Sequence, residues 1–201
     1  HAERWVKALQ SLFGRIDRHL EIGAVVISGN GPTLVPVGVD GRPVAPVLHW
    51  IDTREERVAG QASFFLPKAR WFMNHCPEAY EATSRFLSCP DFINRELTGE
   101  SVSVLPSLDF IKYHWEPDAI SAYGLDSSLF PDHIMTGDRI GEVSKAASSR
   151  YGIPAKIPVF AGGSDFLMAI LGTAAIRNGR TCDRAGTSEG INHCSNVPVE
   201  S

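Results

Sequence analysis

The chain has few cysteines, and none of them is placed as cysteines are in metal or redox motifs. Its 201 residues include four: Cys76, Cys89, Cys182 and Cys194. No two form a Cys-x-x-Cys pair, and Cys182 with His193-Cys194 supplies only three ligand-type groups, whereas a structural zinc takes four. The sequence therefore predicts no metal site and four reduced thiols, as is usual in the cytoplasm.

Positive charge is also scarce. Lys and Arg number 19 against 23 Asp and Glu, for a net charge of −4, and they form no basic run. Binding to nucleic acid or to an anionic membrane through surface charge requires a basic patch, so the sequence argues against both partners and favours a small molecule. No stretch is apolar for long enough to span a bilayer, and neither an internal repeat nor a low-complexity tract is present.

The most informative stretch runs from residue 157 to residue 190. The apolar run 157–160 precedes Gly162 and Gly163, a pattern that predicts a buried strand ending in a tight turn. Asp165 comes next, and apolar residues then recur at helical spacing, which puts Asp165 at or near the N-cap of a helix. Strand-to-helix junctions of this kind hold ligands in open α/β sheets, although Asp is also a common cap for stability alone.

A second motif follows that helix. Asn178-Gly179 predicts a turn and residues 181–184 a short strand, which leads into Gly186, Thr187 and Ser188. A glycine and two hydroxyls in a tight turn offer N–H and O–H donors to a phosphate, but the same composition is frequent in ordinary loops. The two motifs together predict an acid and an anion-binding turn near each other in sequence.

The first half of the chain adds one more candidate. An amphipathic helix is expected over residues 5–20, a strand over 24–27, a hairpin around Asp40-Gly41, and proline-interrupted helices over 55–97. Between the hairpin and these helices, the segment from His49 to Arg54 places Trp50 two residues before Asp52. These two side chains are candidate ligand contacts, or else a buried ring and a helix-start acid.

The order of these motifs resembles the FGGY family of carbohydrate kinases, which includes xylulokinase, gluconokinase and glycerol kinase. The matching elements are Trp50-x-Asp52-x-Arg54, Lys68-x-x-Trp71, Pro77-Glu78-x-Tyr80, Leu97-Thr98-Gly99, Gly162-Gly163-x-Asp165 and Gly186-Thr187-Ser188. The resemblance covers nearly the whole chain, and chance composition does not produce ordered matches over so many positions.

The resemblance implies an incomplete α/β fold: the ribonuclease H-like, actin-like ATPase domain of a two-domain sugar kinase. Residues 1–178 would be part of the N-terminal, sugar-binding domain, and residues 179–201 would begin the C-terminal, ATP-binding domain. It also implies ATP-dependent phosphorylation of a sugar, polyol or sugar acid in the cytoplasm, with ATP and Mg²⁺ as cofactors. A homodimer is compatible with the resemblance.

Site roles follow from the same resemblance. Asp165 would be the catalytic base and would also contact substrate; Asn30, Trp50 and Asp52 would bind the sugar; Gly186, Thr187 and Ser188 would bind phosphate or ATP. Loose phosphoryl-transfer transition states are stabilised mainly by alignment and charge, which suits this division of roles.

Two departures from the family pattern bear on function. The family's Asp-x-Gly-Thr phosphate loop is not found, so we expect the chain to be a fragment, or the product of an incomplete gene, and inactive alone. Gly31 and Pro32 stand where relatives carry hydrogen-bonding side chains, which leaves the sugar open. The alternative function is a non-catalytic sugar-binding or interaction module derived from such a kinase.

Overall fold

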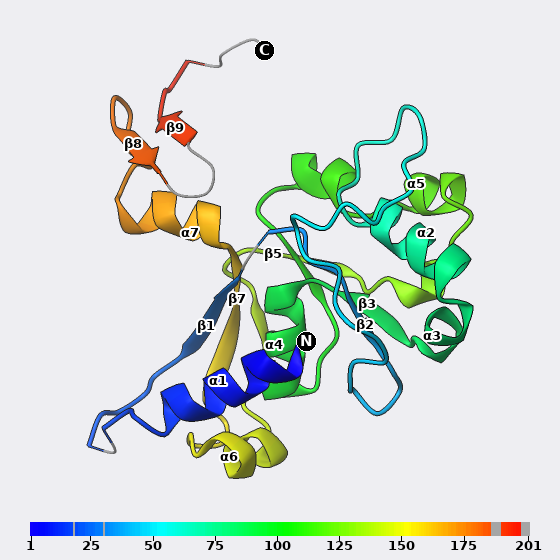
Figure 1. The fold of residues 1–201 in the computed structure, drawn as a ribbon. Coiled ribbons are helices and arrows are strands. Elements are labelled where there is room, and N and C mark those ends of the chain that lie inside the picture. The colour runs from blue at the N-terminus through cyan, green and yellow to red at the C-terminus, as the bar shows by residue number, and fades with distance from the viewer. Residues whose placement is uncertain (18, 30, 186–189, 198–201) are drawn as a thin grey trace.

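The computed structural model describes residues 1–17, 19–29, 31–185 and 190–197 (Figure 1). At its centre lies a three-stranded sheet in the order β1-β7-β6. Strand β1 (Val25–Gly29) runs parallel to β7 (Pro158–Ser164), and β6 (Arg139–Glu142) runs antiparallel to β7. Because β1 and β7 are far apart in sequence, their pairing joins an early segment of the chain to a late one.

Three helices pack around this sheet: α1 (Glu3–Phe13), α4 (Cys89–Thr98) and α6 (Lys145–Tyr151). Their apolar faces share one buried cluster with the strands, which includes Val6, Val25, Phe92, Leu97, Tyr151 and Val159. Helix α1 ends before Gly14, so Leu20 lies outside it and is 65% exposed. The amphipathic helix predicted over residues 5–20 is therefore shorter than its pattern suggested.

A second buried cluster lies beside the sheet. The antiparallel pair β2 (Val35–Val37) and β3 (Arg85–Leu87) contributes to both clusters, with Val35, Val37 and Leu87 in the first and Phe86 in the second. The second cluster also draws on α2 (Leu66–His75), α5 (Pro117–Ala122) and η2 (Ser127–Leu129), and Tyr80 of α3 (Pro77–Ala82) packs against it. Its aromatic members are Phe65, Phe72, Phe86, Trp115, Tyr123 and Phe130. Aromatic rings supply much of this core because each buries a large apolar area.

The helical region predicted over residues 55–97 is only partly helical. Residues 55–65 are irregular, and β3 interrupts the helices because its backbone pairs with β2. Pro67, Pro77 and Pro90 each lie in the first turn of a helix, where their missing N–H groups would have had no partner within the helix. These prolines therefore start α2, α3 and α4.

The remaining elements connect the sheet to the C-terminal part. Strand β4 (Ser103–Leu105) runs parallel to β5 (His133–Met135), with η1 (Leu108–Tyr113) between them. Helix α7 (Asp165–Gly172) follows β7, and β8 (Thr181–Arg184) forms an antiparallel pair with β9 (Gly190–His193). Figure 1 shows α7, β8 and β9 at the end of the sheet away from α1 and α6.

The glycine pair in β7 does not form the predicted turn. Gly162 and Gly163 lie within the strand, which continues to Ser164. A Cβ atom on Gly162 would overlap the carbonyl oxygen of Ile27 in β1, where the β1–β7 register shifts. Glycine is thus required by the close approach of two strands, and not by a turn.

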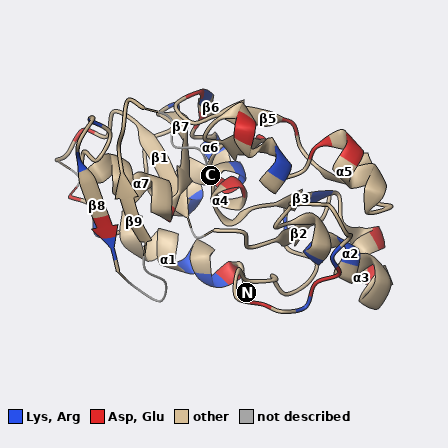
Figure 2. Ribbon diagram, turned by 90° about the horizontal axis from the view of Figure 1, so that it is seen from above, with Lys and Arg blue, Asp and Glu red and all other residues tan. Residues whose placement is uncertain are grey.

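Surface properties agree with the composition. Figure 2 shows acidic and basic residues interspersed along the elements and not gathered on one of them. Within the described ranges, no helix combines the length and the apolar character that a membrane span requires.

Candidate active site

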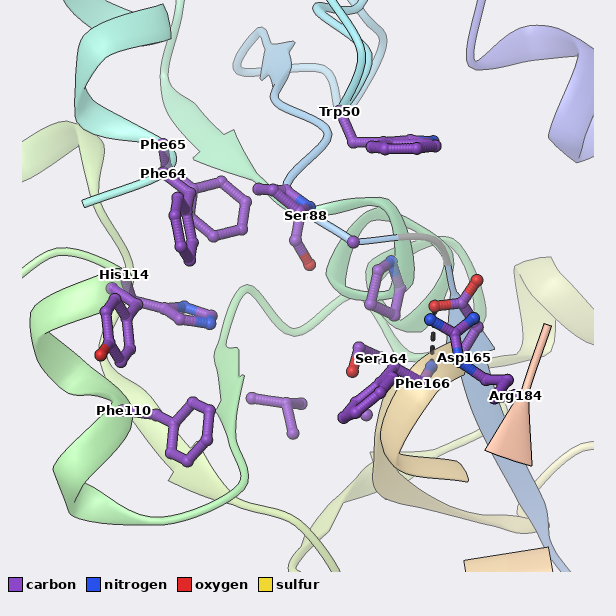
Figure 3. Close-up of a pocket in the computed structure, with 16 residues that line it drawn as sticks. Trp50, Phe64, Phe65, Ser88, Phe110, His114, Ser164, Asp165, Phe166 and Arg184 are labelled. Carbon is purple, nitrogen blue, oxygen red and sulfur yellow. Dashed lines mark hydrogen bonds between the residues drawn. The ribbon is translucent and has the colours of Figure 1, made fainter. Parts of the chain in front are cut away.

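A cavity of about 390 Å³ opens where β7 ends and α7 begins (Figure 3). Six aromatic side chains contribute to its wall: Trp50, Phe64, Phe65, Phe110, Tyr113 and Phe166. A few polar side chains, Asp165 among them, share the wall with these rings. Largely apolar walls with a small number of polar groups, at this volume, are typical of small-molecule sites.

Asp165 is the first residue of α7, and the N-cap is Ser164. The Ser164 hydroxyl accepts a hydrogen bond from the Leu167 N–H at 3.5 Å, whereas the Asp165 carboxylate accepts one from the Phe166 N–H at 2.8 Å. Asp165 was expected at or near the cap, and it proves to be the neighbour of the cap. Its exposed carboxylate lies at the positive end of the helix dipole, free to face a ligand.

Trp50 lies on another side of the same cavity (Figure 3). It comes from the long loop between β2 and α2 and is 37% exposed. A ring that contributes to a cavity wall and stays partly open to solvent can present its face or edge to the carbon skeleton of a ligand.

Asp52 is occupied by a different interaction and is not among the residues that line the cavity. Arg54 donates two side-chain hydrogen bonds to its carboxylate, at 2.9 and 2.6 Å. These bonds hold the pKa of Asp52 below its usual range, because they stabilise the charged form. Lys68 donates to the Asp52 carbonyl oxygen at 3.0 Å, and Arg54 lies over the Trp71 ring.

The Trp-x-Asp-x-Arg segment is thereby fastened onto α2. The ion pair between Asp52 and Arg54 and the stacking on Trp71 fix the loop two residues beyond Trp50. The arrangement gives Asp52 and Arg54 a part in holding Trp50 at the cavity.

Most cavity residues were not predicted from the sequence. Phe64 stacks on Tyr113, with 5.4 Å between ring centroids and 9° between planes, and Phe110 packs edge-on against Tyr113. Phe110 and Tyr113 are three residues apart in η1, a spacing that places two rings on one side of a helical turn. That spacing was the only local signal, and it could not show that these rings meet Phe64.

Arg184 was also missed. Strand β8 brings its side chain to the cavity, where the guanidinium lies 4.8 Å from the centre of the Phe166 ring. Its Nε is buried and has no hydrogen-bond partner among the described residues. A buried donor on a permanent cation is suited to an anionic group such as a phosphate.

Four predicted site residues lie outside the described residues: Asn30, Gly186, Thr187 and Ser188. Their sequence neighbours do line the cavity, since Gly31 and Pro32 follow Asn30 and Arg184 precedes Gly186. No group of three or more His, Cys, Asp or Glu side chains that could hold a metal ion occurs in the part of the chain that the structure describes. Mg²⁺ that is bound mainly through substrate phosphates does not require such a group.

Comparison with known proteins identifies the family. The profile of the FGGY family of carbohydrate kinases, N-terminal domain, matches residues 57–172. The chain belongs to the FGGY family of carbohydrate kinases. It is 25% identical over 215 residues to a xylulose kinase of Lactococcus lactis, covering 92% of this chain and 43% of that protein. It is 29% identical over 182 residues to an autoinducer-2 kinase of an Enterobacter species, covering 82% of this chain and 34% of that protein.

Solved structures show the same fold. The crystal structure of xylulose kinase from Rhodospirillum rubrum superposes with a TM-score of 0.86 at 19% identity, over 98% of this chain and 47% of that one. Gluconate kinase from Lactobacillus acidophilus gives 0.76 at 17% identity, over 94% and 44%. The predicted actin-like α/β fold is thus confirmed, and this FGGY chain spans under half the length of these relatives. The domain boundary at residues 178 and 179 stays a prediction.

Proposed function

We propose that this FGGY chain forms the sugar-binding half of an ATP-dependent carbohydrate kinase, with Asp165 as general base. The observation that carries the proposal is the exposed Asp165 carboxylate in the wall of an aromatic-lined cavity of ligand size. The chemistry is transfer of a phosphoryl group from ATP to an alcohol of a sugar, polyol or sugar acid.

Asp165 accepts the proton of the attacking hydroxyl as that oxygen bonds to phosphorus and ADP leaves. A positioned base of this kind contributes about 10²–10⁴-fold to the rate. Among the described residues, the carboxylate accepts one hydrogen bond, from the N–H of Phe166, so oxygen lone pairs remain for the substrate. Its position at the start of α7 suits an acidic side chain, because the helix dipole favours negative charge there.

The sugar occupies the aromatic part of the cavity. Trp50 packs against its carbon skeleton, and Asn30 is assigned to the hydroxyls in this proposal. Asp52, whose carboxylate is bound by Arg54, contributes by holding the loop that carries Trp50. Gly31 and Pro32 line the wall without offering a side-chain donor or acceptor, so selectivity depends on other groups. The relative named xylulose kinase supports a sugar as the substrate.

The phosphate end of the site lies on the β8 side. Arg184, whose buried Nε has no hydrogen-bond partner among the described residues, fits a phosphate oxygen, and Gly186, Thr187 and Ser188 follow it in sequence. Mg²⁺ supplies charge neutralisation when it is bound with ATP. Arg184 keeps the phosphate aligned with Asp165, which lies in the wall of the same cavity.

The test uses a complete two-domain enzyme that contains this chain. In Asp165→Asn the amide keeps the side-chain volume and can still hydrogen-bond a hydroxyl, but it cannot accept the proton. Turnover is expected to fall about 10²–10⁴-fold, with sugar affinity retained. The control is Asp118→Asn, which changes an exposed acid in the first turn of α5 outside the cavity.

Near-normal turnover of Asp165→Asn would remove Asp165 from the mechanism. Sugar binding without turnover in the unmodified enzyme would favour the alternative, a non-catalytic module derived from a kinase. Normal turnover in both variants, or a loss in both, would contradict a specific role for the acid in the cavity.

A further inference from the structure

A chain of buried polar groups runs from the interior of the protein to the wall of the candidate active site. It starts at Asp91, which is 1% exposed. The Asp91 carboxylate accepts hydrogen bonds from the Ser88 hydroxyl at 2.6 Å, the Ser103 hydroxyl at 3.1 Å and the Val104 N–H at 3.3 Å. Ser103 is itself fully buried, and its hydroxyl oxygen lies 3.4 Å from Nδ1 of His114.

The direction of each hydrogen bond among Asp91, Ser103 and His114 follows from which groups carry a hydrogen to donate. A serine hydroxyl has one hydrogen to donate, and Ser103 donates it to the Asp91 carboxylate. The Ser103 oxygen can therefore only accept from His114, so the proton of the imidazole is on Nδ1. The other ring nitrogen, Nε2, is left with a lone pair and no hydrogen.

The protonation states are consistent with this assignment. Burial raises the pKa of Asp91 to about 6, so the carboxylate is ionised at neutral pH. Burial also lowers the pKa of His114 to about 3, so its ring is neutral. These protonation states agree with the directions given above, in which Ser103 donates to Asp91 and accepts from His114.

The ring of His114 is fixed in place and faces the cavity. Three rings surround it: Phe65 at 4.9 Å, Trp115 at 5.4 Å and His133 at 5.7 Å between centroids. Figure 3 shows the imidazole directed into the cavity, which His114 lines. Its distal nitrogen, Nε2, is thus a rigid acceptor in an otherwise mostly aromatic wall.

We propose that Nε2 of His114 accepts a hydrogen bond from one hydroxyl of the substrate and makes His114 a specificity-determining residue, with Ser103 and Asp91 as positioning residues. The inference rests on the proposed function and adds a recognition group where Gly31 and Pro32 offer none. An acceptor without a hydrogen selects for groups that donate, so a hydroxyl is preferred over a fluorine of similar size.

The alternative is that His114 is a packed core histidine whose neighbours only fill space. The two possibilities predict different effects of removing Nε2 on the affinity ratio between two ligands. A packing role changes the affinity for all ligands together, whereas a recognition role changes the ratio between a sugar and its analogue that lacks one donor.

The first measurement titrates the full chain by calorimetry with D-xylulose, L-fuculose and D-gluconate. The sugar that binds best is then compared with its monodeoxyfluoro analogues, each with one hydroxyl replaced. Besides the hydroxyl that Asp165 faces in the proposed function, we expect one position at which the fluoro analogue binds about 10-fold more weakly than the parent sugar, as loss of one hydrogen bond implies. In His114→Phe the same ratio is expected to fall to about 1, and in Ser103→Ala to an intermediate value. His75→Phe, which removes an exposed histidine on α2, should leave the ratio unchanged.

The second measurement needs no ligand. Imidazole ¹⁵N chemical shifts distinguish a protonated from an unprotonated nitrogen, and His114 is assigned from the signal missing in His114→Phe. A proton on Nε2 at neutral pH overturns the inference, and so do fluorine penalties that are unchanged at every position in His114→Phe. If none of the three sugars binds the unmodified chain, the proposed function itself fails and the inference falls with it.

Discussion

The contact between β1 and β7 permits a sharp test of how the site is built. Replacing Gly162 with alanine places a Cβ atom 2.9 Å from the carbonyl carbon of Ile27 and in overlap with its oxygen, whereas ordinary contacts begin at 3.4 Å. Both opposing atoms belong to backbone, so no side-chain rotation can relieve the clash. The two strands have to separate.

The size of the effect follows from what this separation disturbs. Overpacking in a core costs about 1–3 kcal/mol, and each weakened interstrand hydrogen bond adds about 0.5–1.5 kcal/mol. We expect Gly162→Ala to lower the free energy of unfolding by about 2–4 kcal/mol. The neighbouring Gly163 is the matched control, because an added Cβ would meet the flexible end of Met168 at 3.2 Å. Gly163→Ala should cost less than about 1 kcal/mol, since alanine also restricts the unfolded chain.

The assay is urea unfolding of the two variants and the unmodified chain, followed by circular dichroism. Similar losses of stability in the two variants would refute the argument from close backbone approach. So would an unchanged stability of Gly162→Ala, because the glycine would then serve no steric purpose.

Three further predictions concern single residues. Trp50→Ala should weaken sugar binding in calorimetry and leave the melting temperature nearly unchanged, since the ring is partly exposed; a large drop in melting temperature would make Trp50 a core residue. Arg184→Gln in a complete enzyme should raise the KM for ATP and leave sugar affinity unchanged; the opposite pattern would place Arg184 on the sugar. The stability of the unmodified chain relative to Asp91→Asn should fall as pH rises from about 4 to about 6. Burial raises the pKa of Asp91 from 3.8 to about 6, so the folded state binds the proton more tightly than the unfolded state and loses this advantage as the pH rises. A stability difference that stays constant in urea titrations across that range would contradict this prediction.

Local sequence patterns predicted the elements that bear Asp165 and Arg184. The apolar run in β7, the helix after Asp165 and the strand over 181–184 are all present. Each depends on interactions between near neighbours in sequence, and such interactions can be inferred from spacing. The precise cap was assigned less well, because Ser164 and Asp165 are both good capping residues and adjacent.

The cavity itself could not be predicted in the same way. Phe64 precedes α2, whereas Phe110 and His114 lie in and directly after η1, and no local pattern shows that tertiary packing brings these two segments to α7. The glycine pair was misread for a related reason, since a strand that closely approaches another backbone and a tight turn both favour glycine. Only the position of Ile27 in β1 distinguishes the two.

The contact between β1 and β7 also explains how Asp165 can be held in position while its carboxylate stays available to a ligand. From the described residues its carboxylate accepts one hydrogen bond, donated by the N–H of Phe166, so none of the described side chains sets its position. The position comes instead from the end of β7, where Gly163 and Ser164 pair with Ser28 and Gly29 of β1, and where the Thr136 hydroxyl donates to the Gly162 carbonyl oxygen at 2.8 Å. An acid fixed by backbone pairing keeps its lone pairs for a ligand. The steric requirement at Gly162 and the chemistry at Asp165 are therefore consequences of one strand-to-strand contact.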